Sequence, residues 1–406
     1  MIIVQKYGGS SVADNERIMA VAKRIVRTYA EGNKVIVVLS AQGDMTDELL
    51  ENAKTINPKA SARELDMLIS TGEQQSAALM AMAIHSLGYP AVSLTGGQAG
   101  ILSSSAYGSA RIKNIDPERI QTELDRNNIV LVAGFQGINR LGDITTLGRG
   151  GSDTTAVALA AVLHADICEK YTDADGIYTA DPRIVKNAKK LKEITYDEML
   201  ELAALGANVL ASRSVEMAKK YMVNIAVRSS LQAINDDPGT IVKGECKMEN
   251  TYISGVAVDK NVTGISIKGL TDKPGVAFRV FSLLAKEKIS VDLIIQTVSP
   301  STEISFVVNS ANAGKALEVL NDNAEYIGFG QLDRSDNVAK LSVVGAGLAS
   351  TPGVAAKMFE ALTDSGVNIR MISTSEIKIS VLVDKNEVER AANYVHDIFF
   401  REGGVN

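Results

Sequence analysis

Residues 4–12 read VQKYGGSSV, in which an apolar run ends in a lysine and is followed by two glycines and two serines. The run that starts at Ile2 predicts a β-strand, and the glycine pair predicts a tight turn after it. Apolar residues then recur at helical spacing, namely Ile18, Val21, Ala22, Ile25 and Tyr29. KVIVVLS, at residues 34–40, predicts a second strand. This order predicts a βαβ unit, in which a helix connects two parallel strands.

The alternation of strands and helices continues along the first half of the chain. Further apolar runs predict strands at residues 91–96, 129–137, 166–173 and 223–230. Helical patterns at residues 74–87 and 154–165 lie between them. Strands that are apolar along their whole length are typical of a mostly parallel sheet that is covered by helices on both faces. We therefore expect an α/β fold with three layers in this part of the chain.

Length and composition limit the classes of protein to consider. The chain has 406 residues, which suits two or three domains at roughly 150 residues each. A net charge of −6 and the absence of tryptophan argue against a nucleic-acid-binding surface. Cys168 and Cys246 are the two cysteines, and the three histidines lack metal-ligand spacing, so we predict no protein metal site. With no leader and no apolar run of about 18 residues, we expect a cytoplasmic protein without a membrane contact.

The second half of the sequence contains a repeat. PGVAFRVFSLLAKEKISVDLI begins at Pro274, and PGVAAKMFEALTDSGVNIRMI begins at Pro352; the two align without a gap. A strand pattern precedes each copy, and a second strand and a further helix follow it, which predicts two βαββαβ modules. The expected division is a first domain at 1–235, a linker at 236–260, and modules at 261–335 and 336–406.

The opening segment has the features of a phosphate site. Bare glycine amides at a strand-to-helix turn present partial positive charge, and Lys6 adds a full charge. An ordinary turn with a surface lysine remains the alternative at this point, because glycine pairs are common in turns.

A second candidate is TTLGRGGSDTTAVALA at residues 145–160, where three glycines surround Arg149. The arginine fork suits a carboxylate or a phosphate. Helix capping alone could explain Ser152 and Asp153, but it does not explain the glycines, which suggest a close approach to the backbone.

Two further segments are weaker candidates. YTDADGIYTADPRI, at residues 171–184, does not fit a calcium loop, because Tyr171 and Pro182 occupy the first and twelfth positions. This segment is either a nucleotide-contact loop or a surface loop. In STGEQQSAAL, at residues 70–79, Glu73 is either a functional carboxylate or a first-turn partner of the helix dipole. VVGAGLAS, at 343–350, imitates a dinucleotide fingerprint but lacks the last glycine and belongs to the repeat.

These motifs, in this order and with the repeat, resemble the aspartate kinase (aspartokinase) family over essentially the whole chain. The matching segments are KYGGSS, SAQGDMTDELL, STGEQ, LTGGQAGI, GRGGSDTTA, YTDADGIYTADPRI, RSVEMAKKY and ISTSEIKISVLV. The resemblance implies a monofunctional enzyme with an amino-acid-kinase α/β/α sandwich followed by two ferredoxin-like ACT modules. It also implies ATP-dependent phosphorylation of the β-carboxylate of L-aspartate, the first step toward lysine, threonine and methionine.

The resemblance assigns roles to individual residues. Lys6 and Asp153 would be catalytic, with Asp153 organising Lys6. The residues implied to bind ATP, with Mg²⁺ bridging its phosphates, are Lys6, Tyr7, Gly8, Gly9, Ser10, Thr172, Asp173, Tyr178, Asp181 and Arg183. Those implied to bind aspartate are Ser40, Glu73, Arg149, Gly150, Gly151 and Ser152.

The resemblance also implies regulation by amino acids. Asp272, Ala277 and Gln296 would bind threonine or lysine, and the modules would join chains into a homo-oligomer. Met248 could start a separate regulatory subunit. Four positions depart from the family pattern: Gly97, Ala211, Ser212 and Asn224. A kinase of the same fold that acts on glutamate, acetylglutamate, carbamate or UMP, and a catalytically silent regulatory subunit, are the alternatives.

Overall fold

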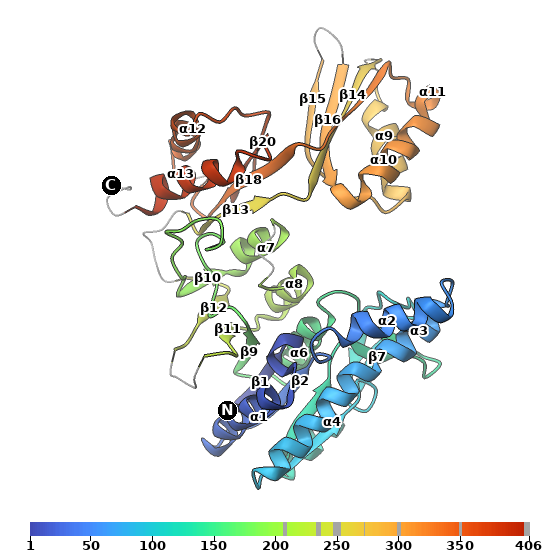
Figure 1. Cartoon of the computed structure of the whole chain (residues 1–406), viewed down its shortest axis with the longest axis vertical. Helices are drawn as coiled ribbons and strands as arrows, with labels where there is room; N and C mark the ends of the chain where they lie inside the picture. The colour runs from blue at the N-terminus through green and yellow to red at the C-terminus, as the bar shows by residue number, and fades with distance from the viewer. Residues whose placement is uncertain are drawn as a thin grey trace. The chain divides into compact units, whose positions relative to one another are not determined.

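The computed structural model describes residues 1–205, 209–232, 237–246, 253–271, 273–298, 302–348 and 351–401. Two compact units are present, and each is described by itself (Figure 1). The first unit comprises Met1–Ile177, Lys190–Ala203 and Asn208–Lys247. The second comprises Tyr178–Lys189, Ala204–Ala207 and Met248–Asn406.

The first unit is built on an eight-stranded sheet with the order β10-β12-β11-β9-β1-β2-β6-β3. Its strands are β1 (Ile2–Tyr7), β2 (Lys34–Leu39), β3 (Ala91–Leu94), β6 (Ile129–Ala133), β9 (Ile167–Thr172), β10 (Glu193–Thr195), β11 (Ile225–Ser229) and β12 (Thr240–Lys243). All neighbouring strands are parallel except β11 and β12. Each strand predicted in this part of the sequence is present. A second, smaller sheet joins β4 (Ile101–Ser103), β5 (Ile112–Ile115), β7 (Gln136–Ile138) and β8 (Ile144–Thr146).

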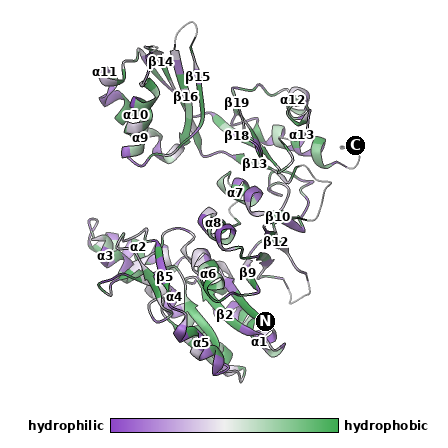
Figure 2. Ribbon diagram, turned by 180° about the vertical axis from the view of Figure 1, so that it is seen from behind, coloured by the Kyte–Doolittle hydropathy of each residue, from purple (hydrophilic) through white to green (hydrophobic). Residues whose placement is uncertain are grey.

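Helices cover both faces of the large sheet. On one face, α1 (Asn15–Ala30) and α4 (Thr71–Ser86) pack against β2 and β6 around a core that includes Tyr7, Val37 and Leu131. On the other face, α6 (Gly151–Val162) contacts β1, β2 and β9, and α8 (Ser212–Tyr221) packs on α6. The remaining helices are η1 (Gly9–Val12), α2 (Met45–Ile56), α3 (Ala62–Ile69), α5 (Glu118–Asp125) and α7 (Tyr196–Ala204). Figure 2 shows the central strands as hydrophobic, as expected for a sheet buried on both faces. The predicted α/β/α fold is confirmed.

The second unit contains two four-stranded antiparallel sheets. In the first module, the sheet β15-β16-β14-β17 packs against α9 and α10. Its elements are β14 (Val262–Leu270), α9 (Val276–Lys286), β15 (Val291–Thr297), β16 (Thr302–Asn309), α10 (Ser310–Asp322), α11 (Ala324–Ile327) and β17 (Gln331–Ser335). The second module has the sheet β13-β18-β20-β19 and two helices. Its elements are β13 (Gly255–Asp259), β18 (Val338–Val344), α12 (Val354–Asp364), β19 (Met371–Thr374), β20 (Lys378–Asp384) and α13 (Val388–Phe400). The predicted ferredoxin-like modules are confirmed.

The structure differs from the predicted division at the linker, residues 236–260. Part of that stretch is β12, which pairs with β10 and β11 in the large sheet. Another part is β13, which pairs antiparallel with β18 and so supplies an edge strand of the second module. The first module is therefore inserted into the second, and a polar, turn-rich composition around the two short strands made them resemble a linker.

None of the helices that the structure describes is long and apolar enough to span a membrane.

Candidate active site

A pocket with an empty volume of about 500 Å³ lies in the first unit. It is lined by Lys6, Ser40, Thr46, Glu73, Phe135, Gly148, Arg149, Gly150, Gly151, Ser152 and Asp153. Lys6 and Ser40 come from the carboxyl ends of β1 and β2, which is where open parallel sheets bind their ligands. Eight residues to which the sequence analysis gave roles thus meet in one pocket, although they come from four separate segments.

Lys6 and Asp153 form an ion pair at the floor of this site. Side chains alternate along β1, so Lys6 points to the face that α6 covers, and Asp153 lies in the first turn of α6. Lys6 Nζ is 2.8 Å from Asp153 Oδ1, and both side chains are less than a tenth exposed. Lys170 donates a hydrogen bond to the other oxygen, Oδ2. Burial opposes ionisation of Asp153, but the two ammonium groups outweigh it, Lys170 more than Lys6, and hold the pKa of the carboxyl well below its usual range.

Lys170 is a residue that sequence reasoning missed. It lies in β9, directly opposite Lys6 in the parallel pairing of β1 with β9. The signal for it is the register between two strands that are far apart in the sequence, which the residues alone do not provide.

Glu73 has a buried carboxylate with one unsatisfied oxygen. Its side chain is in the first turn of α4 and is 4% exposed. Oε1 accepts a hydrogen bond from the backbone N–H of Ala41 at 3.2 Å, whereas Oε2 has no hydrogen-bond partner among the described residues. Burial is the main cause that raises the pKa of Glu73 from 4.5 to about 7. An unpaired acceptor at this place suits a cationic group of a ligand.

The glycines around Arg149 have a conformational reason. Gly148 and Gly150 have φ values of +76° and +73°, in the left-handed region that favours glycine. A Cβ on Gly151 would lie 2.8 Å from the ring of Phe135. Arg149 itself is exposed and makes no hydrogen bond or ion pair with any residue that the structure describes. The loop therefore presents an uncommitted guanidinium at the pocket.

Phe135 and Thr46 line the pocket but were not selected from the sequence. Phe135 has a φ of +67°, which is uncommon for a bulky side chain and typical of functional sites. Thr46 belongs to SAQGDMTDELL, a segment that was quoted for its resemblance without a role for this residue.

The predicted phosphate turn lies beside the Lys6 ammonium. A Cβ on Gly8 would lie 3.6 Å from Lys6 Nζ, and a Cβ on Gly9 would lie 2.7 Å from the carbonyl oxygen of Ala41. Ser10 is exposed at this turn. Tyr7 differs, because its side chain is fully buried on the opposite face of the sheet, stacked on Tyr171 at 4.7 Å between ring centroids. Alternation along β1 separates the two side chains, so the Tyr7 side chain is a core residue and not part of the pocket.

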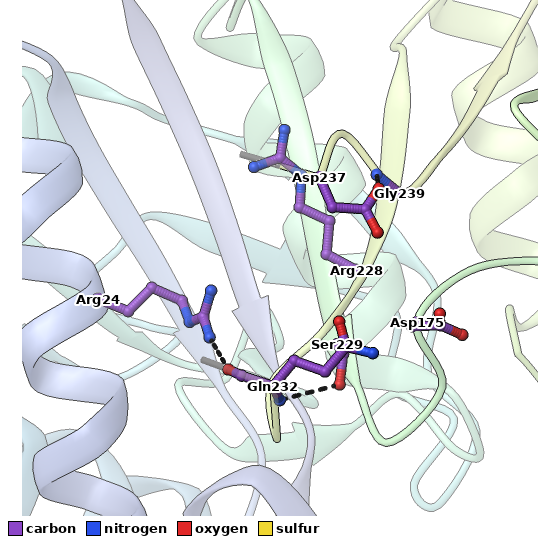
Figure 3. A pocket seen from close by; sticks show the side chains of 7 residues that line it. All are labelled: Arg24, Asp175, Arg228, Ser229, Gln232, Asp237 and Gly239. Atoms are coloured by element: carbon purple, nitrogen blue, oxygen red, sulfur yellow. Dashed lines mark hydrogen bonds between the residues drawn. The ribbon is translucent and has the colours of Figure 1, made fainter. Parts of the chain in front are cut away.

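A second pocket in the first unit, with an empty volume of about 260 Å³, lies near the ends of β9 and β11 (Figure 3). It is lined by Arg24, Asp175, Arg228, Ser229, Gln232, Asp237 and Gly239. Figure 3 shows Arg24 reaching from α1 to the backbone oxygen of Gln232, with which it makes a hydrogen bond of 2.8 Å. Thr172 is the register partner of Ser229, so this pocket adjoins two of the predicted nucleotide residues, Thr172 and Asp173.

The other predicted nucleotide residues belong to the second unit. These are Tyr178, Asp181 and Arg183, and the last two form an ion pair at 2.8 Å. Their segment is anchored within that unit, since the backbone oxygen of Thr179 accepts a hydrogen bond from Val256 at 2.7 Å.

The predicted effector residues lie in the first module of the second unit. Ala277 is half-buried on α9, and Gln296 is exposed on β15. Asp272 and Met248 lie outside the described residues.

One departure from the family pattern, Gly97, has a local explanation. A Cβ on Gly97 would lie 2.8 Å from Ile138 Cγ2, so this position needs a glycine. Ala211 is the residue before α8, and its Cβ would lie 2.3 Å from a Cβ on Gly150. Ser212 is the first residue of α8, and the backbone oxygen of Asn224 accepts a hydrogen bond from Cys168 at 2.9 Å.

A mostly parallel sheet between two helical layers, a lysine and glycine turn at the strand ends, and tandem ferredoxin-like modules define an amino acid kinase that carries ACT domains. The model of the amino acid kinase family matches residues 1–229, and that of the ACT domain matches 265–323 and 341–399. The aspartokinase of Mycolicibacterium smegmatis is 50% identical over 406 residues, covering 98% of this chain and 96% of that one. The chain belongs to the aspartokinase family.

Solved structures agree with this assignment over the whole chain. E. coli aspartokinase III in complex with aspartate and ADP (R-state) has a TM-score of 0.82 at 26% identity, covering 99% of this chain and 100% of that one. The same enzyme in complex with lysine and aspartate (T-state) has a TM-score of 0.78 at 26% identity, covering 98% and 100%.

Proposed function

We propose that this chain transfers the γ-phosphoryl group of ATP to the β-carboxylate of L-aspartate and forms 4-phospho-L-aspartate. The observation that carries the proposal is the set of charges in one pocket: the Lys6 and Asp153 pair, the uncommitted Arg149, and the unsatisfied oxygen of Glu73. L-aspartate has two carboxylates and one ammonium group. Arg149 matches the charge of one carboxylate and Glu73 that of the ammonium group, while Lys6 matches the phosphate that the other carboxylate must approach. The relative crystallised with aspartate and ADP supports the same substrates here.

Phosphoryl transfer to a carboxylate needs no general base. A carboxylate nucleophile has a reference pKa near 4, so it is already ionised at neutral pH. The obstacle is repulsion between the carboxylate and the phosphates, so catalysis rests on positioning and on neutralising charge. Lys6 and the amides of Gly8 and Gly9 would hold the phosphate end of the nucleotide.

The substrate would be oriented by the two uncommitted groups. Arg149 can bind one carboxylate with two parallel hydrogen bonds, which fixes both position and direction. Glu73 would accept hydrogen bonds from the ammonium group of aspartate, and Ser40 and Ser152 would contact the substrate beside it. This arrangement leaves the β-carboxylate to face the phosphate held at Lys6.

The nucleotide would lie from the glycine turn toward Thr172 and Asp173, and Mg²⁺ would accompany it. Among the described residues, no three His, Cys, Asp or Glu side chains gather as a metal site, and both oxygens of Asp153 face lysines. This donor set fits a Mg²⁺ ion that is bound chiefly by phosphate oxygens and water. The ion would neutralise charge on the transferring group.

The ACT modules would bind the end products threonine or lysine and join chains into a homo-oligomer. The complex of E. coli aspartokinase III with lysine supports an amino-acid effector. Such an effector inhibits only if it binds one conformational state more tightly than another. A regulatory subunit that starts at Met248 belongs to this proposal as well.

An initial-rate assay tests the proposed function. ATP consumption is measured with aspartate, glutamate, acetylglutamate, carbamate and UMP, and hydroxylamine traps any acyl phosphate as a hydroxamate. Aspartate should be the preferred acceptor, and preference for another would overturn the assignment. Threonine and lysine, alone and together, should lower the rate; rates that do not respond to either would contradict the effector proposal.

A further inference from the structure

The site contains a second lysine that does not reach the pocket. Lys170 lies opposite Lys6 in the pairing of β1 with β9, so both side chains point toward α6. Its side chain is 11% exposed. Lys6 and Asp153 are among the residues that line the pocket, whereas Lys170 is not. Any effect of Lys170 on the reaction must therefore pass through one of its neighbours.

The two lysines share one carboxylate. Lys6 approaches Oδ1 of Asp153, and Lys170 donates to Oδ2. Each oxygen of Asp153 thus has its own cation, and the three buried groups together carry one excess positive charge when all are ionised. Burial is the largest influence on the pKa of Lys170 and lowers it, while the Asp153 carboxylate opposes that change.

This arrangement affects how Lys6 can move. Without Lys170, Lys6 would be the sole partner of a buried carboxylate, and removing one partner from such a pair is strongly unfavourable. Lys6 would then remain bound to Asp153 instead of turning to an incoming phosphate. With Lys170 on Oδ2, Asp153 stays paired when Lys6 leaves Oδ1.

We propose that Lys170 is a positioning residue that keeps Asp153 paired and so releases Lys6 to bind the transferring phosphoryl group. This inference rests on the proposed function, because it assumes that Lys6 contacts the nucleotide phosphates. It concerns turnover more than aspartate affinity, since Arg149 and Glu73 are untouched.

The test compares Lys170→Met with Lys170→Arg and with a control, Lys243→Met. Lys243 is also a strand lysine of the same sheet and pairs with Glu193 at 2.5 Å, but it does not line the pocket. We expect Lys170→Met to lower kcat by about tenfold or more and to leave KM for aspartate within about twofold. Lys170→Arg should keep most of the turnover because it keeps the charge, and Lys243→Met should match the wild type.

A double-mutant cycle separates positioning from a general loss of structure. In an Asp153→Asn background Lys170 has no carboxylate to hold, so Lys170→Met should change the remaining kcat by less than about twofold. Additive losses would overturn the proposal, as would equal losses in Lys170→Met and Lys170→Arg. Thermal unfolding of each variant shows whether the folded state is retained.

Assays of the wild type separate a failure of the proposed function from a failure of the role proposed for Lys170. If it forms no aspartyl hydroxamate, the proposed function fails. If it forms the hydroxamate and Lys170→Met does so at the same rate, the role of Lys170 fails while the proposed function stands.

Discussion

Replacement of Glu73 by glutamine should make the protein more stable at pH 8 and less active. The carboxyl is 4% exposed, and its pKa is raised from 4.5 to about 7, chiefly by burial. Because the pKa in the folded state is above the unfolded value, the stability associated with this group is complete below pH 4.5. It is lost as the pH rises through about 7.

The size of the effect follows from the same values. A rise from 4.5 to about 7 makes the ionised carboxylate cost about 3 kcal/mol above pH 7. The side-chain oxygen of glutamine can still accept the hydrogen bond from the backbone N–H of Ala41. Its amide N–H groups have no such partner, which costs about 1 kcal/mol. The free energy of unfolding of Glu73→Gln should therefore exceed that of the wild type by about 2 kcal/mol at pH 8. At pH 4.5 the variant should gain nothing.

The assay is urea unfolding of both proteins at pH 4.5, 6 and 8. Asp66→Asn is the matched control, because Asp66 is also a buried carboxylate but is fully paired. It accepts hydrogen bonds from the backbone of Gly108 and from the backbone and hydroxyl of Thr146, at 2.6 to 3.0 Å. That variant should be destabilised. Equal stability of wild type and Glu73→Gln at pH 8, or a gain that does not depend on pH, would refute the reasoning.

Aspartate binding should depend on pH in the opposite direction to stability, because the ionised form of Glu73 is the one that binds the substrate. If Glu73 must be ionised to accept the substrate ammonium, KM for aspartate in the wild type should rise as the pH falls below about 7. The Glu73→Gln variant should have a raised KM that varies less over the same interval. A wild-type KM that stays constant from pH 6 to pH 8 would remove Glu73 from substrate binding.

Three further substitutions test other parts of the structure. Lys6→Met should lower kcat by about 100-fold or more because it removes the cation at the phosphate turn, with thermal unfolding nearly unchanged; a normal kcat would contradict that role. Arg149→Ala should raise KM for aspartate by about 10- to 100-fold, since hydrogen bonds to charged groups contribute about 1.5–3 kcal/mol; tight aspartate binding, measured by calorimetry, would place the carboxylate elsewhere. His396 is 1% exposed, and burial lowers its pKa, so the second unit should lose stability as the pH falls through the ordinary histidine value of 6.5. His396→Gln, which can keep a hydrogen bond to Thr179, should flatten that dependence in thermal unfolding between pH 5 and pH 8.

Much of the fold could be predicted because its elements have strong local signals. The strands of the large sheet are apolar along their whole length, and the aligned repeat in the sequence indicates the two modules directly. The strand β13 was missed because its partner, β18, lies across the whole inserted module, and no local pattern reports such pairing.

The residues of the site also fall into two groups: those that the sequence marks locally and those that only the fold brings together. Lys6, Arg149 and Glu73 could be selected because glycines or helix starts mark them in the sequence. Lys170 could not, because a lysine in a short strand usually reaches solvent, and only the register with β1 brings it to Asp153. The Tyr7 side chain faces away from Lys6, as alternation along β1 predicts, so a nucleotide contact of Tyr7 would have to use its backbone.

The charged side chains in the interior and the pocket of the first unit separate into two kinds, and the difference identifies the site. Glu169 has a full set of partners, since it pairs with Arg228 at 3.0 Å and accepts from Gln5 at 2.9 Å. Glu123 is similarly surrounded by two arginines and an asparagine. Networks of this kind hold strands and helices together and leave nothing for a ligand. The pocket is different: Glu73 keeps an unsatisfied oxygen, an arginine beside it has no partner among the described residues, and two lysines share one carboxylate. A buried carboxylate with an unsatisfied oxygen, such as Glu73, reduces stability in the free protein. Its presence beside an arginine without a protein partner is expected where a ligand of complementary charge completes the pairing.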